Sequence, residues 1–80
     1  MKDKNYQLTV DALLRYQDAM YRIAMSTVRN ADDALDIVQA SALKALENYH
    51  KLKSPDSIRS WLFRIVVNEA IDHIKASGRE

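Results

Sequence analysis

Four residues near the end of the chain could bind a nucleic acid if they share one face of a helix. Trp61, Arg64, Asn68 and Lys75 have the spacing that places side chains along one side of an α-helix. A cation can hold a phosphate, an amide can read the edge of a base, and an indole ring offers a stacking surface. A solvent-exposed face with a half-buried tryptophan explains the same residues equally well. The residues alone therefore leave both interpretations open.

The sequence offers no comparable set of residues for catalysis. His50 and His73 each lack a second histidine three or four residues away, and Asp72 diverges from His73 by about 100° on a helix. Both histidines are predicted to lie at the surface, and adjacent carboxylates fit helix caps better than acid–base pairs. One glycine cannot build a glycine-rich phosphate loop, and no cysteine is present to bind a metal. We therefore expect a protein that is not an enzyme and has no metal and no cofactor.

A second candidate surface lies in the middle of the chain, where acidic residues predominate. Residues 31–49 carry four acidic side chains and one basic, whereas the segments on either side are net basic. Ile37 and Leu43 are expected to point away from the protein core, among these acidic residues. Such a surface could dock a basic partner helix, although isolated apolar residues on a surface are common and are the simpler interpretation.

These residues must be positioned by a small all-α domain. The chain has 80 residues, 48% apolar and 29% charged, which fits one globular domain over residues 1–80. One glycine and one proline cannot supply the turns of a many-stranded β fold, and the lack of cysteine fits a reducing cytoplasm. The longest apolar run is too short to span a membrane, and the first residues do not form a signal peptide. A disulfide miniprotein, a membrane protein and a large enzyme are therefore excluded.

Hydrophobic periodicity predicts a compact bundle of three to four helices. The helices are expected at about residues 9–28, 31–49 and 58–76, with a loop at about 50–57. The predicted N-caps are Thr9, Asn30 and Ser57, and Gly78 follows the last helix. The apolar stripe of the first helix comprises Val10, Leu13, Leu14, Tyr21, Ala24 and Val28, and that of the second comprises Ala31, Leu35, Val38, Ala42, Ala45, Leu46 and Tyr49. The third helix has one stripe of Phe63, Val67, Ala70 and Ile74, edged by Val66 and Ile71, and a shorter one of Ile58, Leu62 and Ile65.

Two linked segments of the chain resemble a known protein family. NADDALDIVQASALKALENYHKL and SIRSWLFRIVVNEAIDHIK, separated by a polar loop, resemble domain 2 of bacterial sigma factors, most closely the extracytoplasmic-function (ECF) group. The family pattern is roughly N-x-x-D-A-x-D-x-V-Q followed by W-L-[FY]-R-I-A-x-N-x-A-x-D. The matching residues are Asn30, Asp33, Ala34, Asp36, Val38, Gln39, Trp61, Leu62, Phe63, Arg64, Ile65, Asn68, Ala70 and Asp72. With a first helix that also resembles the family, the similarity covers about residues 8–77.

The resemblance implies two partners for this chain. In the family, the second helix docks on the clamp helices of the RNA polymerase β′ subunit, and the loop and third helix bind the non-template strand of the promoter −10 element. The residues expected to bind polymerase are Asp33, Asp36, Ile37, Gln39, Ala40 and Leu43, referred to below as the acidic face. The residues expected to bind DNA are Lys51, Lys53, Ser54, Asp56, Ser57, Arg59, Trp61, Arg64, Asn68 and Lys75. An anti-sigma factor is a further expected partner.

The chain departs from the family pattern in three places. Ala40 and Ala42 stand where the family usually has a glutamate and a phenylalanine, which could weaken polymerase docking or loosen the bundle. Leu62 replaces the second of two aromatic residues that primary sigma factors use to open the duplex, so weak intrinsic melting is expected. The sequence stops at Glu80, whereas a full ECF factor continues into domain 4. We expect an excised domain, the alternative being a natural domain-2-only protein whose domain 4 is on a separate polypeptide.

The leading hypothesis is a cytoplasmic sigma domain that binds polymerase and melted promoter DNA without catalysis. One alternative is a sigma-like module that binds polymerase or an anti-sigma partner but does not read DNA. Another is an unrelated helical adaptor, which would require the two linked motifs to be a coincidence.

Overall fold

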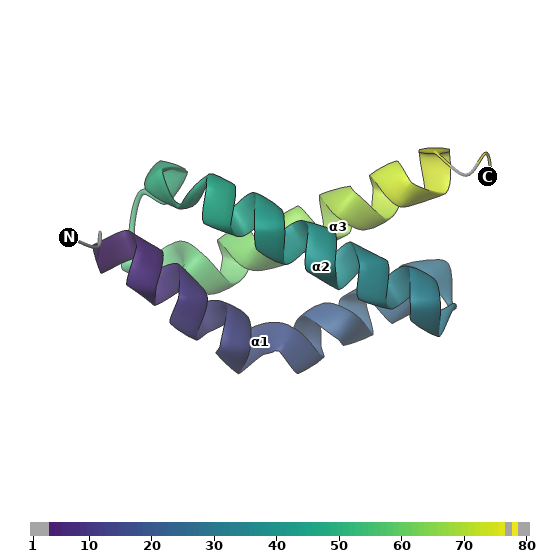
Figure 1. The fold of residues 1–80 in the computed structure, drawn as a ribbon, viewed down its shortest axis with the longest axis horizontal. Coiled ribbons are helices and arrows are strands. Elements are labelled where there is room, and N and C mark those ends of the chain that lie inside the picture. Colours follow the sequence, from purple (N-terminus) through teal and green to yellow (C-terminus); the bar gives the residue numbers. More distant parts are fainter. Residues whose placement is uncertain (1–3, 77, 79–80) are drawn as a thin grey trace.

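Three α-helices account for most of residues 4–76 and 78, the part of the chain that the computed structural model describes. The elements are α1 (Lys4–Val28), α2 (Ala31–Glu47) and α3 (Ile58–Ala76), with two short 3₁₀ helices, η1 (Tyr49–Lys51) and η2 (Pro55–Ser57), between α2 and α3. α2 runs antiparallel to α1 and α3, and each helix contacts the other two (Figure 1). No strand occurs within these residues, so the predicted all-α bundle is confirmed.

α1 begins at Lys4, well before the predicted start at Thr9. Thr9 is not an N-cap, because it lies inside the helix and is fully buried. Its hydroxyl donates a hydrogen bond of 2.7 Å to the carbonyl oxygen of Asn5. A threonine can satisfy its hydroxyl within a helix in this way, so its presence does not fix where the helix starts.

The start of α2 agrees with the prediction. Arg29 has a φ of 56°, a left-handed conformation that ends the path of α1. Asn30 then caps α2, since its side-chain oxygen accepts a hydrogen bond of 2.9 Å from the backbone N–H of Asp33. Asp32 and Asp33 occupy the first turn, where the helix dipole favours carboxylates.

The loop between α2 and α3 differs from the prediction at Ser57. Ser57 belongs to η2 and donates a hydrogen bond of 2.9 Å from its hydroxyl to the carbonyl oxygen of Ser54. Ser54 is the residue that caps, because its side chain accepts from the backbone N–H of Asp56 at 3.3 Å. Pro55 is the first residue of η2. The backbone N–H that proline lacks would have no hydrogen-bond partner within the helix at this position.

Small residues form much of the core. Five alanines belong to the core clusters, none of them more than 6% exposed: Ala12, Ala24, Ala34, Ala45 and Ala70. Short side chains let helix axes approach closely, and larger residues then fill the space beside them. Met20, Ile37, Leu62 and Val66 are the largest of these, each at most 2% exposed. Leu62, a member of the shorter apolar stripe predicted for the third helix, is buried as expected.

The buried side of α2 is not the one that periodicity predicted. Ala34, Ile37, Ser41 and Ala45 are buried, with Ile37 only 2% exposed, whereas Leu35 is 50% exposed. Ile37 was expected to face away from the core, and this expectation is wrong. Ser41 can be buried because its hydroxyl donates to the carbonyl oxygen of Ile37 at 2.7 Å.

Three further residues assigned to apolar stripes are exposed. Leu14 on α1 is 67% exposed, and Val67 and Ile71 on α3 are 43% and 42% exposed. The predicted stripes were therefore too broad, although Ala24, Ala45 and Ala70 are buried as expected.

Candidate nucleic-acid interface

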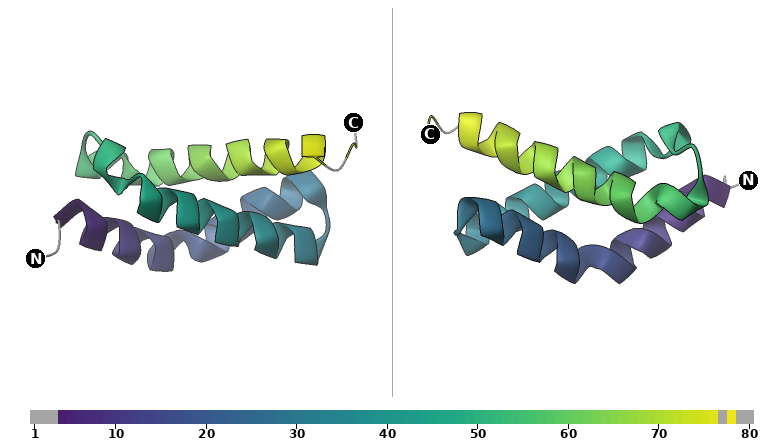
Figure 2. Two further views of the ribbon diagram at one scale, coloured as in Figure 1. Left: turned by 45° about the horizontal axis from the view of Figure 1, so that its top comes forward. Right: turned by 180° about the vertical axis from the view of Figure 1, so that it is seen from behind.

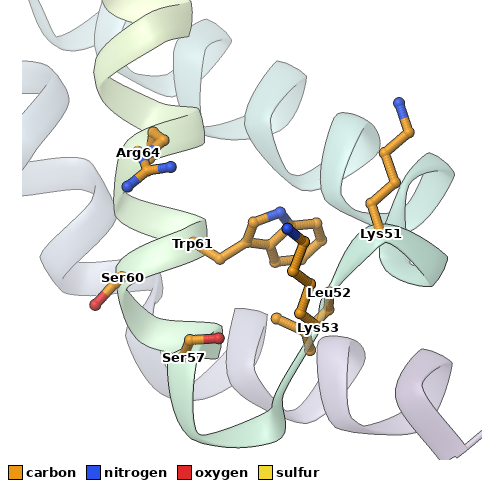
Figure 3. A pocket seen from close by; sticks show the side chains of 7 residues that line it. All are labelled: Lys51, Leu52, Lys53, Ser57, Ser60, Trp61 and Arg64. Carbon is orange, nitrogen blue, oxygen red and sulfur yellow. The ribbon is translucent and has the colours of Figure 1, made fainter.

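A hollow of about 330 Å³ lies between the loop that follows α2 and the first half of α3. We call it the cationic hollow. It is lined by Lys51, Leu52, Lys53, Ser57, Ser60, Trp61 and Arg64. Figure 3 shows the Trp61 indole pointing from α3 toward the segment that carries Lys51 and Lys53.

The loop side of the hollow is held by main-chain hydrogen bonds and by one buried side chain. Asn48 ends α2, and its side-chain amide donates to the carbonyl oxygen of Lys44 at 2.8 Å. η1 follows, and Leu52 is then only 5% exposed. Because Leu52 is buried, its neighbours Lys51 and Lys53 remain exposed on the rim.

The α3 side of the hollow follows from helical spacing. Ser57, Ser60, Trp61 and Arg64 are three or four residues apart and therefore share one side of the chain as it enters α3. Trp61 is half-buried, and its ring packs against a core cluster of Ala12, Ala45 and Leu62. One part of the indole is thus fixed in the bundle while another part lines the hollow.

The hollow carries a net positive charge. Lys51, Lys53 and Arg64 are exposed, and none of them forms an ion pair with another described residue. Cations without a partner are free to bind phosphates, and the serine hydroxyls can donate or accept hydrogen bonds. Stacking of an unpaired base on an aromatic ring contributes about 1–3 kcal/mol. The arrangement can therefore bind a single-stranded nucleic acid.

The structure brings together half of the residues expected to bind DNA. Lys51, Lys53, Ser57, Trp61 and Arg64 all line the cationic hollow. Leu52 and Ser60 also line it and were not predicted. The helical spacing of Ser60 from Ser57 and Arg64 could have revealed it, whereas a leucine in a polar loop carries no such signal.

The other residues expected to bind DNA lie outside the hollow. Asn68 and Lys75 are exposed farther along α3, and Ser54 is half-buried in the loop. Asp56 and Arg59 line a separate hollow between α1 and α3, together with Arg15 of α1. The Arg59 guanidinium lies 5.2 Å from the centre of the Phe63 ring, a cation–π contact that turns it away from Trp61.

The acidic face is exposed at most of its predicted positions. Asp36, Gln39, Ala40 and Leu43 are exposed, and Leu43 is 60% exposed, as predicted. Ile37 is buried and cannot offer its side chain to a partner. Asp33 is only partly exposed, and its Oδ1 lies 3.4 Å from Nε2 of His73 on α3. His73 lies at the surface, with 32% of its side chain exposed and the rest partly covered in this contact.

Beside the acidic face, α2 and α3 are also joined by Lys44 and Glu69. Lys44 Nζ lies 2.6 Å from Glu69 Oε2. The hydrogen bond to Glu69 and the attraction of its carboxylate raise the pKa of Lys44 above its usual value. A hollow next to this pair is lined by Asp36, Ile37, Ala40, Glu69, Asp72 and His73. Within the described residues, no group of carboxylates and histidines is arranged to hold a metal ion.

Residues 13–80 match the Sigma-70 region 2 family. The chain belongs to this family. Region 2 of this protein is 40% identical over 74 residues to the RNA polymerase sigma factor SigV of Bacillus subtilis, covering 92% of this chain and 45% of that protein.

Two further relatives carry the ECF description that the motifs predicted. The ECF RNA polymerase sigma factor SigM of Mycobacterium tuberculosis is 33% identical over 61 residues, covering 76% of this region 2 and 31% of SigM. The ECF RNA polymerase sigma factor SigW of Bacillus subtilis is 30% identical over 60 residues, covering 75% of this region 2 and 32% of SigW. The chain thus spans less than half the length of these relatives, and the ECF assignment is confirmed. No solved structure shows a significant match.

No helix in the described part of region 2 combines the length and the apolar character that a membrane span needs.

Proposed function

We propose that this region 2 acts in transcription initiation by holding an unpaired promoter strand in the cationic hollow. One observation carries the proposal: the hollow gathers three unpaired cations, two serine hydroxyls and a fixed indole from two separate segments. Cations bind the phosphates of any sequence, while an aromatic ring requires a base that has left its stack. The combination favours a single strand over a duplex, and by the family resemblance this is the non-template strand of the −10 element.

Beyond the hollow, the strand would follow the exposed side of α3. Asn68 and Lys75 continue the line of Arg64 at helical spacing and are exposed. An amide at Asn68 can read a base edge, and the Lys75 ammonium can hold a phosphate. Arg59 and Asp56 have no part in this path, since they face the hollow near α1.

The exposed part of the acidic face is the proposed docking surface for RNA polymerase. Asp36 supplies negative charge, Gln39 and Ala40 lie beside it, and Leu43 offers an apolar contact. Leu35, 50% exposed on α2, replaces Ile37 as the second apolar residue of this surface. Carboxylates around small apolar contacts fit a basic coiled coil such as the β′ clamp helices.

In this function the domain acts by non-covalent binding in the cytoplasm, without catalysis, metal or cofactor. An anti-sigma factor and a domain 4, in the same chain or on another polypeptide, complete the set of proposed partners. The proposal of these partners comes from the family to which the chain belongs and not from a contact described above.

The deciding experiment is binding of the chain to a fluorescent single-stranded oligonucleotide carrying a −10-like sequence, measured by anisotropy at two salt concentrations. Saturable binding that weakens with salt and exceeds binding to the same sequence as a duplex is the expected result. Calorimetry with purified β′ clamp helices tests the docking surface separately. Binding to the clamp helices without any binding to the oligonucleotide would reject the DNA role and favour a module that docks on protein alone.

A further inference from the structure

Tyr6 lies in a part of α1 that precedes the match to Sigma-70 region 2, which begins at residue 13. Its ring meets the ring of Tyr49 edge to face, with 5.4 Å between centroids and 82° between planes. Tyr49 is the first residue of η1, the turn that leads into the cationic hollow. The first turns of α1 and η1 lie at the same end of the bundle (Figure 2).

Apart from the main-chain hydrogen bonds of the loop and the buried Leu52 that follows it, η1 has no side chain of its own in the core. None of its three residues is buried, and it has no side-chain cap. Its position therefore depends on packing against its neighbours, and α1 is the helix that contacts it. The Tyr6–Tyr49 pair is a specific contact of this kind, since edge-to-face aromatic pairs stabilise more than their buried area alone.

The position of η1 in turn sets the rim of the hollow. The carbonyl oxygen of Tyr49 accepts a hydrogen bond of 3.1 Å from the backbone N–H of Leu52, and Lys51 donates its N–H to Asn48 at 2.9 Å. Leu52 lines the hollow, with Lys51 and Lys53 on either side of it in the chain. A shift of Tyr49 would therefore move both lysines relative to Trp61.

We infer that Tyr6 is a positioning residue for the cationic hollow. Through Tyr49 it fixes the loop lysines opposite Trp61, so the first two turns of α1 take part in single-strand binding without touching the strand. The consequence for DNA affinity rests on the proposed function, whereas the consequence for the shape of the hollow does not.

Trp61 is the only tryptophan of the chain and lines the hollow, so its fluorescence reports the shape of the hollow directly. The test compares the chain with Tyr6→Ala and Tyr6→Phe. The matched control is Tyr21→Ala, which removes a half-buried tyrosine of α1. Tyr21 packs against a separate core cluster, formed by Met20, Ala24, Ala34, Ile37, Val66 and Ala70. Each protein is measured for acrylamide quenching of Trp61, affinity for the single-stranded oligonucleotide, helical circular dichroism and affinity for β′ clamp helices.

We expect Tyr6→Ala to change the quenching of Trp61 and to weaken oligonucleotide binding by about two- to tenfold, the equivalent of one aromatic pair. Tyr6→Phe keeps the ring and should behave as the parent, and clamp-helix affinity should be unchanged in both. Tyr21→Ala should lower the melting temperature without altering the quenching of native Trp61.

Equal Trp61 quenching in the parent and in folded Tyr6→Ala would overturn the inference. A change in quenching by Tyr21→Ala as large as that by Tyr6→Ala would also overturn it. If Tyr6→Ala does not fold, Tyr6→Leu keeps apolar volume without the ring edge and is judged by the same quenching. A parent chain that binds no oligonucleotide would reject the proposed function, while the quenching comparison would still decide the role of Tyr6.

Discussion

The ammonium group of Lys44 on α2 lies 2.6 Å from the carboxylate of Glu69 on α3, across the groove between the two helices. Glu69 is only 16% exposed at its side chain, whereas Lys44 is 51% exposed. The pair therefore joins the helix that carries the acidic face to the helix that carries Trp61 and Arg64.

The Lys44–Glu69 pair predicts a loss of stability at alkaline pH. Glu69 raises the pKa of Lys44 in the folded state above the ordinary value of 10.5. The stabilisation is therefore complete below that value and is lost as pH rises through the higher pKa of the folded protein. Melting curves across this range should show a steeper decline for the parent than for Lys44→Met. Parallel declines would show that the ion pair contributes nothing in solution.

Ile37 and Leu43 should respond to truncation in opposite ways. Ile37 is 2% exposed, so Ile37→Ala should cost about 2–5 kcal/mol of unfolding free energy, and Ile37→Val about 0.5–1.5 kcal/mol. Leu43 is 60% exposed, so Leu43→Ala should change stability by less than about 0.5 kcal/mol but weaken binding to the clamp helices. Urea unfolding and calorimetry measure the two effects. A stable Ile37→Ala variant would contradict the packing of α2.

Removing two cations from the cationic hollow should reduce the salt dependence of DNA binding. Each phosphate contact to a single strand contributes about 0.7 to the slope of log affinity against log salt. The double variant Lys53→Ala, Arg64→Ala should therefore lower the slope by about 1.4 and weaken binding at low salt. Arg22→Ala removes an exposed cation of α1 that does not line the hollow, and it serves as the control. An unchanged slope in the double variant would remove these residues from the interface.

Reversing one charge on α2 should affect polymerase binding selectively. Asp36 is exposed, so Asp36→Arg should leave helicity intact and slow association with the basic clamp helices. The effect should shrink as salt is added, because exposed charges are screened. Asp11→Arg on α1 is the matched control for an exposed carboxylate elsewhere. Equal losses in both variants would point to net charge and not to the acidic face.

Asn30 should contribute measurably to the stability of α2. Its side chain accepts the hydrogen bond from Asp33 N–H, so Asn30→Ala should destabilise the domain by about 0.5–2 kcal/mol. Asn30→Asp keeps an acceptor at the same place and should recover most of the loss. Thermal unfolding of the two variants checks the prediction, and identical melting temperatures would argue against the cap.

The number of helices and the boundary between the first two, at Asn30, could be predicted from the sequence. Helix caps and polar loops are recognisable from a few neighbouring residues. The sequence misled on the buried side of α2. Large apolar residues dominate a periodicity argument, yet the buried side carries Ala34, Ser41 and Ala45. Small residues are favoured where helices approach closely, and that closeness is a property of the packed bundle. The start of α1 was missed for a related reason, since Thr9 has the chemistry of a cap but uses it inside the helix.

Half of the expected DNA residues could be grouped from the sequence because they lie on consecutive turns or in one short loop. The separation of Arg59 from this group could have been foreseen, because helical spacing places it on the side of α3 opposite Trp61 and four residues from Phe63, whose ring its guanidinium contacts. What the spacing does not give is the position of this side of α3 beside α1. The contact between Tyr6 and Tyr49 likewise depends on where the first turns of α1 lie relative to η1, which is decided by the packing of the bundle.

Leu52 is the only buried side chain between Tyr49 and Ser57, so we expect the loop to open locally without unfolding of the helices. Exposing a single leucine costs about 1.5–3 kcal/mol, much less than unfolding a typical domain. The loop amides should therefore exchange their hydrogens with solvent through local opening, well before those of α2 or α3. A hollow that opens in this way can admit a strand from the side and close over it. The rate of strand binding would then depend on how often Leu52 leaves the core.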